Sequence, residues 1–164
     1  MINVREWMTS PVTTVKPRDS ILHAREIMER QRINQLPVAV RGRLVGIVTD
    51  RDLRDAFPSI LGISGRRRKR RRALTSFEDV AVEDVMTRNV LTHSPDRTIG
   101  DAARMMRRER IGAVPVLDKG KLVGILTRSD LLDACATLVE RVRALTSEGG
   151  EPPERPSGAP RENS

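Results

Sequence analysis

The sequence contains few of the residues on which several classes of site depend. Aromatic residues make up 2% of the 164 residues, with two Phe, one Trp and no Tyr, which argues against a nucleic-acid site built on base stacking. The single cysteine, Cys135, excludes a disulfide within one chain. With only His23 and His93 beside it, no Cys/His zinc site can form, and we expect no metal.

Long apolar runs are also missing. None approaches the roughly 20 residues of a transmembrane helix, and the first residues, MINVREWMTS, lack the basic-then-apolar order of a signal peptide. We therefore expect a cytoplasmic protein that makes no contact with a membrane. The 38% of apolar residues still supplies an aliphatic core.

Positive charge is concentrated in one place. The net charge is +8, and one run of the sequence holds seven cations: Arg66, Arg67, Arg68, Lys69, Arg70, Arg71 and Arg72. The run predicts either a solvated loop or a binding site for a polyanion, which would be nucleic acid or an acidic protein. The rest of the chain is nearly neutral, so attraction of nucleic acid by the whole protein is a weak inference.

An internal repeat organises most of the chain. A shift of 78 positions aligns residues 4–54 with residues 82–132 without a gap, and about 22 of the 51 pairs are identical. The matches include Pro37-Val38 with Pro115-Val116, and residues 44–47 with residues 122–125. Two copies of one structural unit are therefore predicted.

Local signals give the same order of elements in both copies. Residues 11–15, rich in β-branched side chains and followed by Pro17, predict a short extended segment. Ser20 and Thr98 are suitable N-caps for the first helices. Residues 36–48 and 114–126 predict β-hairpins with turns at Arg41-Gly42 and residues 118–120. Helices are expected again over residues 52–56 and 130–145.

Each unit therefore reads as β-α-β-β-α, and we predict an α/β (α+β) fold in which two tandem units pack sheet against sheet. The expected boundaries are residues 1–56 for the first unit, 57–81 for a linker and 82–146 for the second unit. Residues 147–164, rich in Pro, Gly, Glu and Ser, are expected to be a disordered tail.

Three motifs occur in both copies: V-x-x-h-M-T at the start, h-P-V in the middle and G-h-h-T-x-x-D at the end. Together they resemble the CBS domain pair, or Bateman module, named for cystathionine β-synthase. The amino-acid sequence around these motifs is most similar to stand-alone bacterial pairs of the acetoin-utilisation type. The resemblance implies a cleft between the units for a regulatory adenosyl ligand: AMP, ADP, ATP or S-adenosylmethionine, and sometimes a dinucleotide.

The third motif offers suitable chemistry for such a ligand. Thr49 would present a hydroxyl and a backbone N–H at a helix N-terminus, where anions bind well. Asp52 could accept two hydrogen bonds from a ribose diol. Thr127 and Asp130 repeat this arrangement in the second copy.

The resemblance places the adenine between two kinds of segment in each copy. The segments before the first helices contain Val15, Lys16, Pro17, His93, Ser94 and Pro95, and those before h-P-V contain Ile33, Asn34, Gln35, Ile111, Gly112 and Ala113. Lys16, Arg51 and Arg128 are the nearest cations for phosphates. Gly112 and Ala113 are small, whereas Asn34 and Gln35 are bulkier, so the sequence leaves open which cleft admits a ligand.

A second interpretation needs no ligand, because Thr49 and Thr127 could act only as N-caps, with Asp52 and Asp130 as first-turn carboxylates. Two functions follow. One is a regulatory, adenosyl-binding module that signals to a partner protein. The other is a constitutive interaction protein that binds nucleic acid or an acidic partner through residues 66–72. No nucleophile with a base and no phosphate-binding glycine loop is present, so we expect no enzyme. The family resemblance also implies a homodimer formed through helices, with the last helix as the contact.

Overall fold

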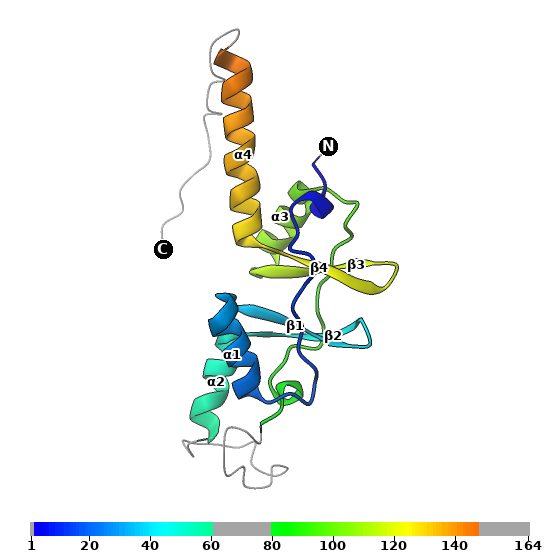
Figure 1. The fold of residues 1–164 in the computed structure, drawn as a ribbon, viewed down its shortest axis with the longest axis vertical. Helices are drawn as coiled ribbons and strands as arrows, with labels where there is room; N and C mark the ends of the chain where they lie inside the picture. Colours follow the sequence, from blue (N-terminus) through cyan, green and yellow to red (C-terminus); the bar gives the residue numbers. More distant parts are fainter. Residues whose placement is uncertain (1, 61–79, 148–164) are drawn as a thin grey trace. The chain divides into compact units, whose positions relative to one another are not determined.

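The computed structural model describes residues 2–60 and 80–147, in which the same elements occur twice (Figure 1). The first copy contains η1 (Val4–Glu6), α1 (Ile21–Gln31), β1 (Gln35–Val40), β2 (Arg43–Thr49) and α2 (Asp50–Ile60). The second copy contains η3 (Val82–Asp84), α3 (Ile99–Arg108), β3 (Ala113–Asp118), β4 (Lys121–Thr127) and α4 (Arg128–Ser147). The mixed helix-and-strand fold predicted from the repeat is confirmed.

Each copy is centred on an antiparallel hairpin. β1 pairs with β2, and β3 pairs with β4. Both turns use two residues with positive φ: 51° and 77° at Arg41 and Gly42, and 48° and 79° at Lys119 and Gly120. This left-handed pair matches the twist of the flanking strands, and glycine adopts it at little cost. The predicted hairpins and their turns are thus confirmed.

Side-chain caps start the helices at the expected places. The Ser20 hydroxyl accepts a hydrogen bond from the His23 N–H at 3.1 Å, and Thr98 accepts one from the Asp101 N–H at 3.1 Å. The closing helices begin two residues earlier than predicted, directly after Thr49 and Thr127. These threonines end a strand and also cap the next helix, so no loop separates the two elements.

The extended segment predicted over residues 11–15 is shorter than expected. It forms a single parallel bridge, in which the Val15 N–H donates to Pro37 O at 3.1 Å and Val15 O accepts from the Ala39 N–H at 2.9 Å. His93 forms the equivalent bridge with Val116. A short segment that starts at Pro11 and turns at Pro17 has few backbone donors for a longer ladder.

The start of each repeat packs on the other repeat. The N–H groups of Thr9 and Ile125 each donate to the other residue's carbonyl, at 2.9 and 3.1 Å. Ile47 and Thr87 make the equivalent pair at 2.9 Å in both directions. Val4 is fully buried in the core of the second copy. The boundaries of the sequence repeat therefore do not coincide with those of the structural units, because each unit also includes the start of the other repeat.

Two aliphatic clusters form the interior. The first contains Val15, Ile21, Ala24, Ile27, Met28, Leu36, Val38, Val48, Leu53, Val80, Val82 and Met86, and the second contains Val4, Ala102, Met106, Val114, Val116 and Leu126. β2 contacts β4, which confirms that the hairpins pack against each other. Over residues 2–60 and 80–147, no helix is long and apolar enough to cross a membrane.

Candidate ligand-binding site

The two Thr–Asp pairs at the ends of β2 and β4 have nearly the same geometry. Asp52 Oδ2 accepts from the Thr49 N–H at 2.8 Å and from the Thr49 hydroxyl at 2.7 Å. Asp130 Oδ2 accepts from the Thr127 N–H at 2.6 Å and from its hydroxyl at 2.8 Å. Each threonine hydroxyl also accepts from the aspartate N–H, at 3.2 and 3.4 Å. The capping role considered from the sequence is therefore present in both copies.

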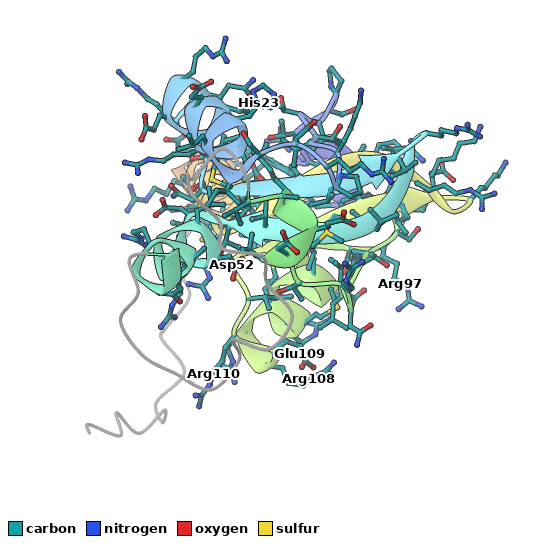
Figure 2. The ribbon with its side chains drawn as sticks, turned by 90° about the horizontal axis from the view of Figure 1, so that it is seen from below. His23, Asp52, Arg97, Arg108, Glu109 and Arg110 are labelled. Carbon is teal, nitrogen blue, oxygen red and sulfur yellow. The ribbon has the colours of Figure 1, made fainter. Side chains whose placement is uncertain are left out.

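This capping does not use the whole carboxylate. The strand–helix bonds end on Oδ2 in both copies, and a carboxylate has further acceptor capacity on Oδ1. Asp52 and Asp130 are half-buried, and Figure 2 shows Asp52 beside the first turn of α2. A carboxylate whose rotamer is fixed by its own threonine is preorganised to accept further hydrogen bonds.

Residues before β1 and β3 adjoin these pairs, as predicted. The Asp50 N–H donates to Asn34 O at 2.9 Å, and the Arg128 N–H donates to Gly112 O at 3.1 Å. Within the hairpins, Gln35 stands opposite Thr49 and Ala113 opposite Thr127. The structure thus brings Thr49, Asp52, Asn34 and Gln35 together in one copy, and Thr127, Asp130, Gly112 and Ala113 in the other.

The predicted adenine segments lie elsewhere. Val15 pairs in parallel with Val38, so residues after Val15 run toward the hairpin turn and away from Thr49. Lys16 and Pro17 therefore do not join the Thr49–Asp52 pair. By the same register, His93 pairs with Val116, and Ser94 and Pro95 continue away from Thr127.

The residues that come earlier in each segment lie on the opposite side of the bridge from Lys16 and Ser94. Val12 and Thr13 precede the bridge on the side of the β1 start, and Val90 and Leu91 hold the equivalent places before His93. The Thr13 hydroxyl donates to Gln31 Oε1 at 2.8 Å, near the end of α1. The parallel direction of the bridge would have identified these residues, but the sequence does not encode that direction locally.

The first residues of α2 and α4 differ in charge. Asp50 begins α2, and its Oδ2 lies 2.9 Å from Arg54 Nη2. Arg128 begins α4 at the equivalent position and is exposed. Arg51, the cation predicted for the first copy, is also exposed. A phosphate at these helix starts would meet a carboxylate in the first copy and a guanidinium in the second.

Two hollows lie outside the Thr–Asp pairs. One, of about 720 Å³, includes Lys16 together with Ser10, Pro11, Val12, Thr14, Asp19, His23, Ala39, Arg41, Gly42, Leu122 and Val123. The other, of about 500 Å³, is lined by Thr92, His93, Ser94, Arg97, Asp101, Arg104, Met105 and Arg108. Lys16 thus lines the first hollow, and His93 and Ser94 line the second.

Two other predictions fall outside the described residues. The basic run from Arg66 to Arg72 lies in the gap between residues 60 and 80, and the predicted tail lies outside the described residues except for Ser147, the last residue of α4. Within the described ranges, no group of three or more His, Cys, Asp or Glu side chains is placed to hold a metal ion.

Two β-α-β-β-α copies with exchanged starts and one capped Thr–Asp pair each define a tandem domain pair. The chain belongs to the CBS domain family, whose model matches residues 4–59 and 82–137. A CBS domain-containing protein of Dictyostelium discoideum is 34% identical over 142 residues, which are 85% of this chain and 94% of that protein. YhcV of Bacillus subtilis, also a CBS domain-containing protein, is 29% identical over 131 residues, 80% of this chain and 84% of its own.

Solved structures agree with this assignment. AcuB of Vibrio cholerae, named for acetoin utilization, has 28% identity and a TM-score of 0.74 and covers 87% of this chain and 98% of its own. The CBS pair of protein MJ0100, solved with 5′-methylthioadenosine and S-adenosyl-L-methionine, has 28% identity, a TM-score of 0.69 and coverages of 84% and 98%. CBSX2, solved with AMP, has 28% identity, a TM-score of 0.68 and coverages of 85% and 99%.

Proposed function

We propose that the chain is a regulatory module that binds an adenosyl compound beside its two Thr–Asp pairs and signals the bound state to a partner protein. The observation that carries this proposal is the duplicated geometry in which the threonine N–H and hydroxyl hold Asp Oδ2 at 2.6–2.8 Å. The complexes of MJ0100 and CBSX2 with adenosyl ligands support it.

Each residue has a distinct role in this mechanism. Thr49 and Thr127 fix the carboxylates, whose Oδ1 atoms accept hydrogen bonds from ribose hydroxyls. The N-termini of α2 and α4 attract negative charge. In the second copy, the Arg128 guanidinium can donate two hydrogen bonds to a phosphate. In the first copy, the Asp50 carboxylate stands at the equivalent position and would repel a phosphate. We therefore assign phosphorylated nucleotides to the Asp130 side and the cationic S-adenosylmethionine to the Asp52 side.

Signalling requires that the ligand bind one arrangement of the two copies better than another. The start of each repeat, which packs on the other repeat, connects the two copies mechanically. In the first repeat, residues 8–10 contact β4 before the chain continues to β1. A ligand that draws the two hairpins together would therefore shift both ends of each exchanged segment.

We propose no catalytic activity. Helix capping accounts for the two threonine hydroxyls of the sites, since each donates to the aspartate Oδ2 and accepts from the aspartate N–H. Among matched enzymes, the inosine-5′-monophosphate dehydrogenase of Korarchaeum cryptofilum is covered over only 21% of its length. In that enzyme the region similar to this chain is one part of a much longer protein.

We also propose that the module is a homodimer that associates through α4. This helix exposes four large apolar side chains: Leu132, Val139, Val142 and Leu145. Val139 follows Leu132 by seven positions and Val142 follows Val139 by three, the spacing of a helix–helix seam. A second copy of the same helix would cover them.

A ligand screen tests the proposed function. Purified protein is heated with AMP, ADP, ATP, S-adenosylmethionine, NAD or cyclic dinucleotides. A ligand at 100 times its Kd adds about 2.7 kcal/mol, a rise in Tm of roughly 5–10 °C at this size. The rise for AMP should disappear in Asp130→Ala and persist in Asp52→Ala, and S-adenosylmethionine should show the reverse.

Asp84→Ala is the matched control, since Asp84 Oδ2 also accepts a backbone N–H at the start of a helix, that of Ala81 at 3.3 Å, but Asp84 lies outside both Thr–Asp pairs. Loss of the cap alone should lower Tm similarly in all three variants without changing the ligand response. No shift with any compound, or shifts retained in both site variants, would overturn the proposal.

A further inference from the structure

The hollow beside α3 has features of a second, separate binding site. It lies between the segment Thr92–Arg97 and one face of α3, and has a volume of about 500 Å³. Neither Thr127 nor Asp130 lines it. Two residues that the sequence assigned to adenine, His93 and Ser94, belong to its wall instead.

Three arginines give the hollow a positive excess of charge. Arg97, Arg104 and Arg108 line the hollow, and Asp101 is the one carboxylate among its lining residues. Arg104 is paired with Asp101, and Arg108 Nε lies 2.7 Å from Glu109 Oε1. The Thr98 hydroxyl, followed by Arg104, holds the pKa of Asp101 below its ordinary value, and Arg97 contributes to the same shift. Two guanidinium groups thus act on a single carboxylate.

The repeat shows that this charge is specific to the second copy. A shift of 78 positions places Asp19, His23, Glu26 and Arg30 where the second copy has Arg97, Asp101, Arg104 and Arg108. Two carboxylates of the first copy are therefore replaced by arginines on an otherwise similar scaffold.

Polar groups complete the wall. His93 is 9% exposed, and its Nδ1 lies 3.1 Å from Ser94 O. A carbonyl oxygen only accepts, so Nδ1 donates to it. The hydroxyls of Thr92 and Ser94 line the same wall and can donate hydrogen bonds. Figure 2 shows Arg97 and Arg108 pointing outward from the yellow-green part of the ribbon that contains α3.

We propose that this hollow binds an oxyanion, specifically the phosphate group of a small phosphate monoester. Arg97, Arg104 and Arg108 would supply planar donor forks that match phosphate geometry. The hydroxyls of Thr92 and Ser94 would donate to the remaining oxygens. This inference does not depend on an adenosyl ligand at the Thr–Asp pairs.

The proposal is tested by measuring anion binding before and after arginines of the second copy are replaced by the residues at the equivalent positions of the first copy. The probes are inorganic phosphate, glycerol 3-phosphate and, for comparison, glycerol, added at low salt while backbone amide and arginine Nε signals are followed by NMR. In the unaltered protein, the two phosphate compounds should shift the signals of residues 92–97 and of Arg104 and Arg108. Glycerol should shift none of them.

The variant Arg97→Asp/Arg104→Glu installs the residues of the first copy and should weaken binding of both phosphate compounds at least tenfold. Arg43→Asp/Arg141→Glu makes the same change in net charge at exposed positions elsewhere and should alter binding less than twofold. Asp101→Asn removes the competing carboxylate and should tighten binding several-fold. Circular dichroism checks that each variant is folded.

Three results would overturn the proposal: equal weakening in both double variants, weaker binding in Asp101→Asn, or loss of the shifts in Asp130→Ala. The last would place the anion at the Thr–Asp pair. A protein that binds inorganic phosphate but not glycerol 3-phosphate would also contradict the proposal, because its site would then accept a free anion and exclude a phosphate monoester.

Discussion

The side-chain nitrogen of Gln35 lies against the backbone of Gly112, so close that a Cβ on Gly112 would stand 3.1 Å from Gln35 Nε2. The two residues belong to different copies of the repeat. Their neighbours lead directly to the two sites, because Asn34 O accepts from the Asp50 N–H and Gly112 O accepts from the Arg128 N–H. A side chain of the first copy thus lies beside a residue that adjoins the Asp130 pair.

Removal of this side chain should favour binding in the second copy. Gln35→Ala installs the residue that the second copy has at the equivalent position, Ala113. We expect AMP to bind the Asp130 side several-fold more tightly, because the space beside Gly112 is widened. Calorimetric titration in an Asp52→Ala background measures this affinity. Unchanged or weaker binding would show that Gln35 does not limit access.

Gly124 and Gly46 should be essential for the exchanged packing. A Cβ on Gly124 would stand 2.6 Å from Met8 Sδ and 3.0 Å from Thr9 O, and one on Gly46 would stand 2.5 Å from Met86 Sδ. Overpacking at such contacts costs about 1–3 kcal/mol. We expect Gly124→Ala to lower the free energy of unfolding by this amount in urea denaturation.

Gly100→Ala is the control for that experiment, since its Cβ would meet only ordinary contacts in α3, with Arg104 Nη1 the nearest atom at 3.6 Å. Alanine in a helix interior is better than glycine by roughly 0.5–1 kcal/mol, so this variant should be more stable. In a double-mutant cycle, Met8→Ala should recover part of the Gly124→Ala loss. A purely additive cycle would contradict the contact.

The pKa of Asp101 should depend on its hydrogen bond with the capping residue Thr98. The Thr98 hydroxyl is the largest cause of its lowered pKa, and Arg104 is the next. Thr98→Val should therefore raise the pKa of Asp101 toward its ordinary value of 3.8 more than Arg104→Gln does. Carbon-detected NMR titration of the carboxyl group measures both. A larger rise in Arg104→Gln would reverse the assignment.

The sign of the linked stability follows from the direction of the shift. A carboxylate whose pKa is lowered by folding stabilises the protein at pH values above its unfolded pKa, and this stability is lost as pH falls through the folded pKa. Thr98→Val should consequently reduce the acid dependence of unfolding that arises from Asp101. The matching helix α1 has His23 in place of Asp101 and should not show this acid dependence.

The exposed apolar side chains of α4 should decide the oligomeric state. We expect a dimer by sedimentation at micromolar concentration, and a monomer for Leu132→Glu/Val139→Glu, because charge at the seam opposes association. Ala144→Glu places a like charge on an exposed position outside the four residues and should remain dimeric. A monomeric unaltered protein would overturn the proposed homodimer.

Much of the fold could be predicted because its signals are local or repeated. The caps Ser20 and Thr98, the paired turns at Gly42 and Gly120 and the duplicated Thr–Asp motif each depend on neighbours within a few residues. The bridge between Val15 and Val38 could not be predicted in direction, because it depends on a distant strand. Whether Lys16, Pro17, His93 and Ser94 contact a ligand depends on the same direction and stays a prediction.

The sequence by itself determined that two like units exist, where their first helices begin and that the Thr-x-x-Asp motif recurs in both. These properties follow from hydrogen bonds over three residues and from apolar spacing along one element. Only the tertiary structure decided that Met8 packs on Gly124 of the other copy, that Gln35 approaches Gly112, and that three arginines share one hollow. Contacts between segments that are distant in the sequence cannot be predicted from either segment alone. They depend on how all the side chains of the core fit together.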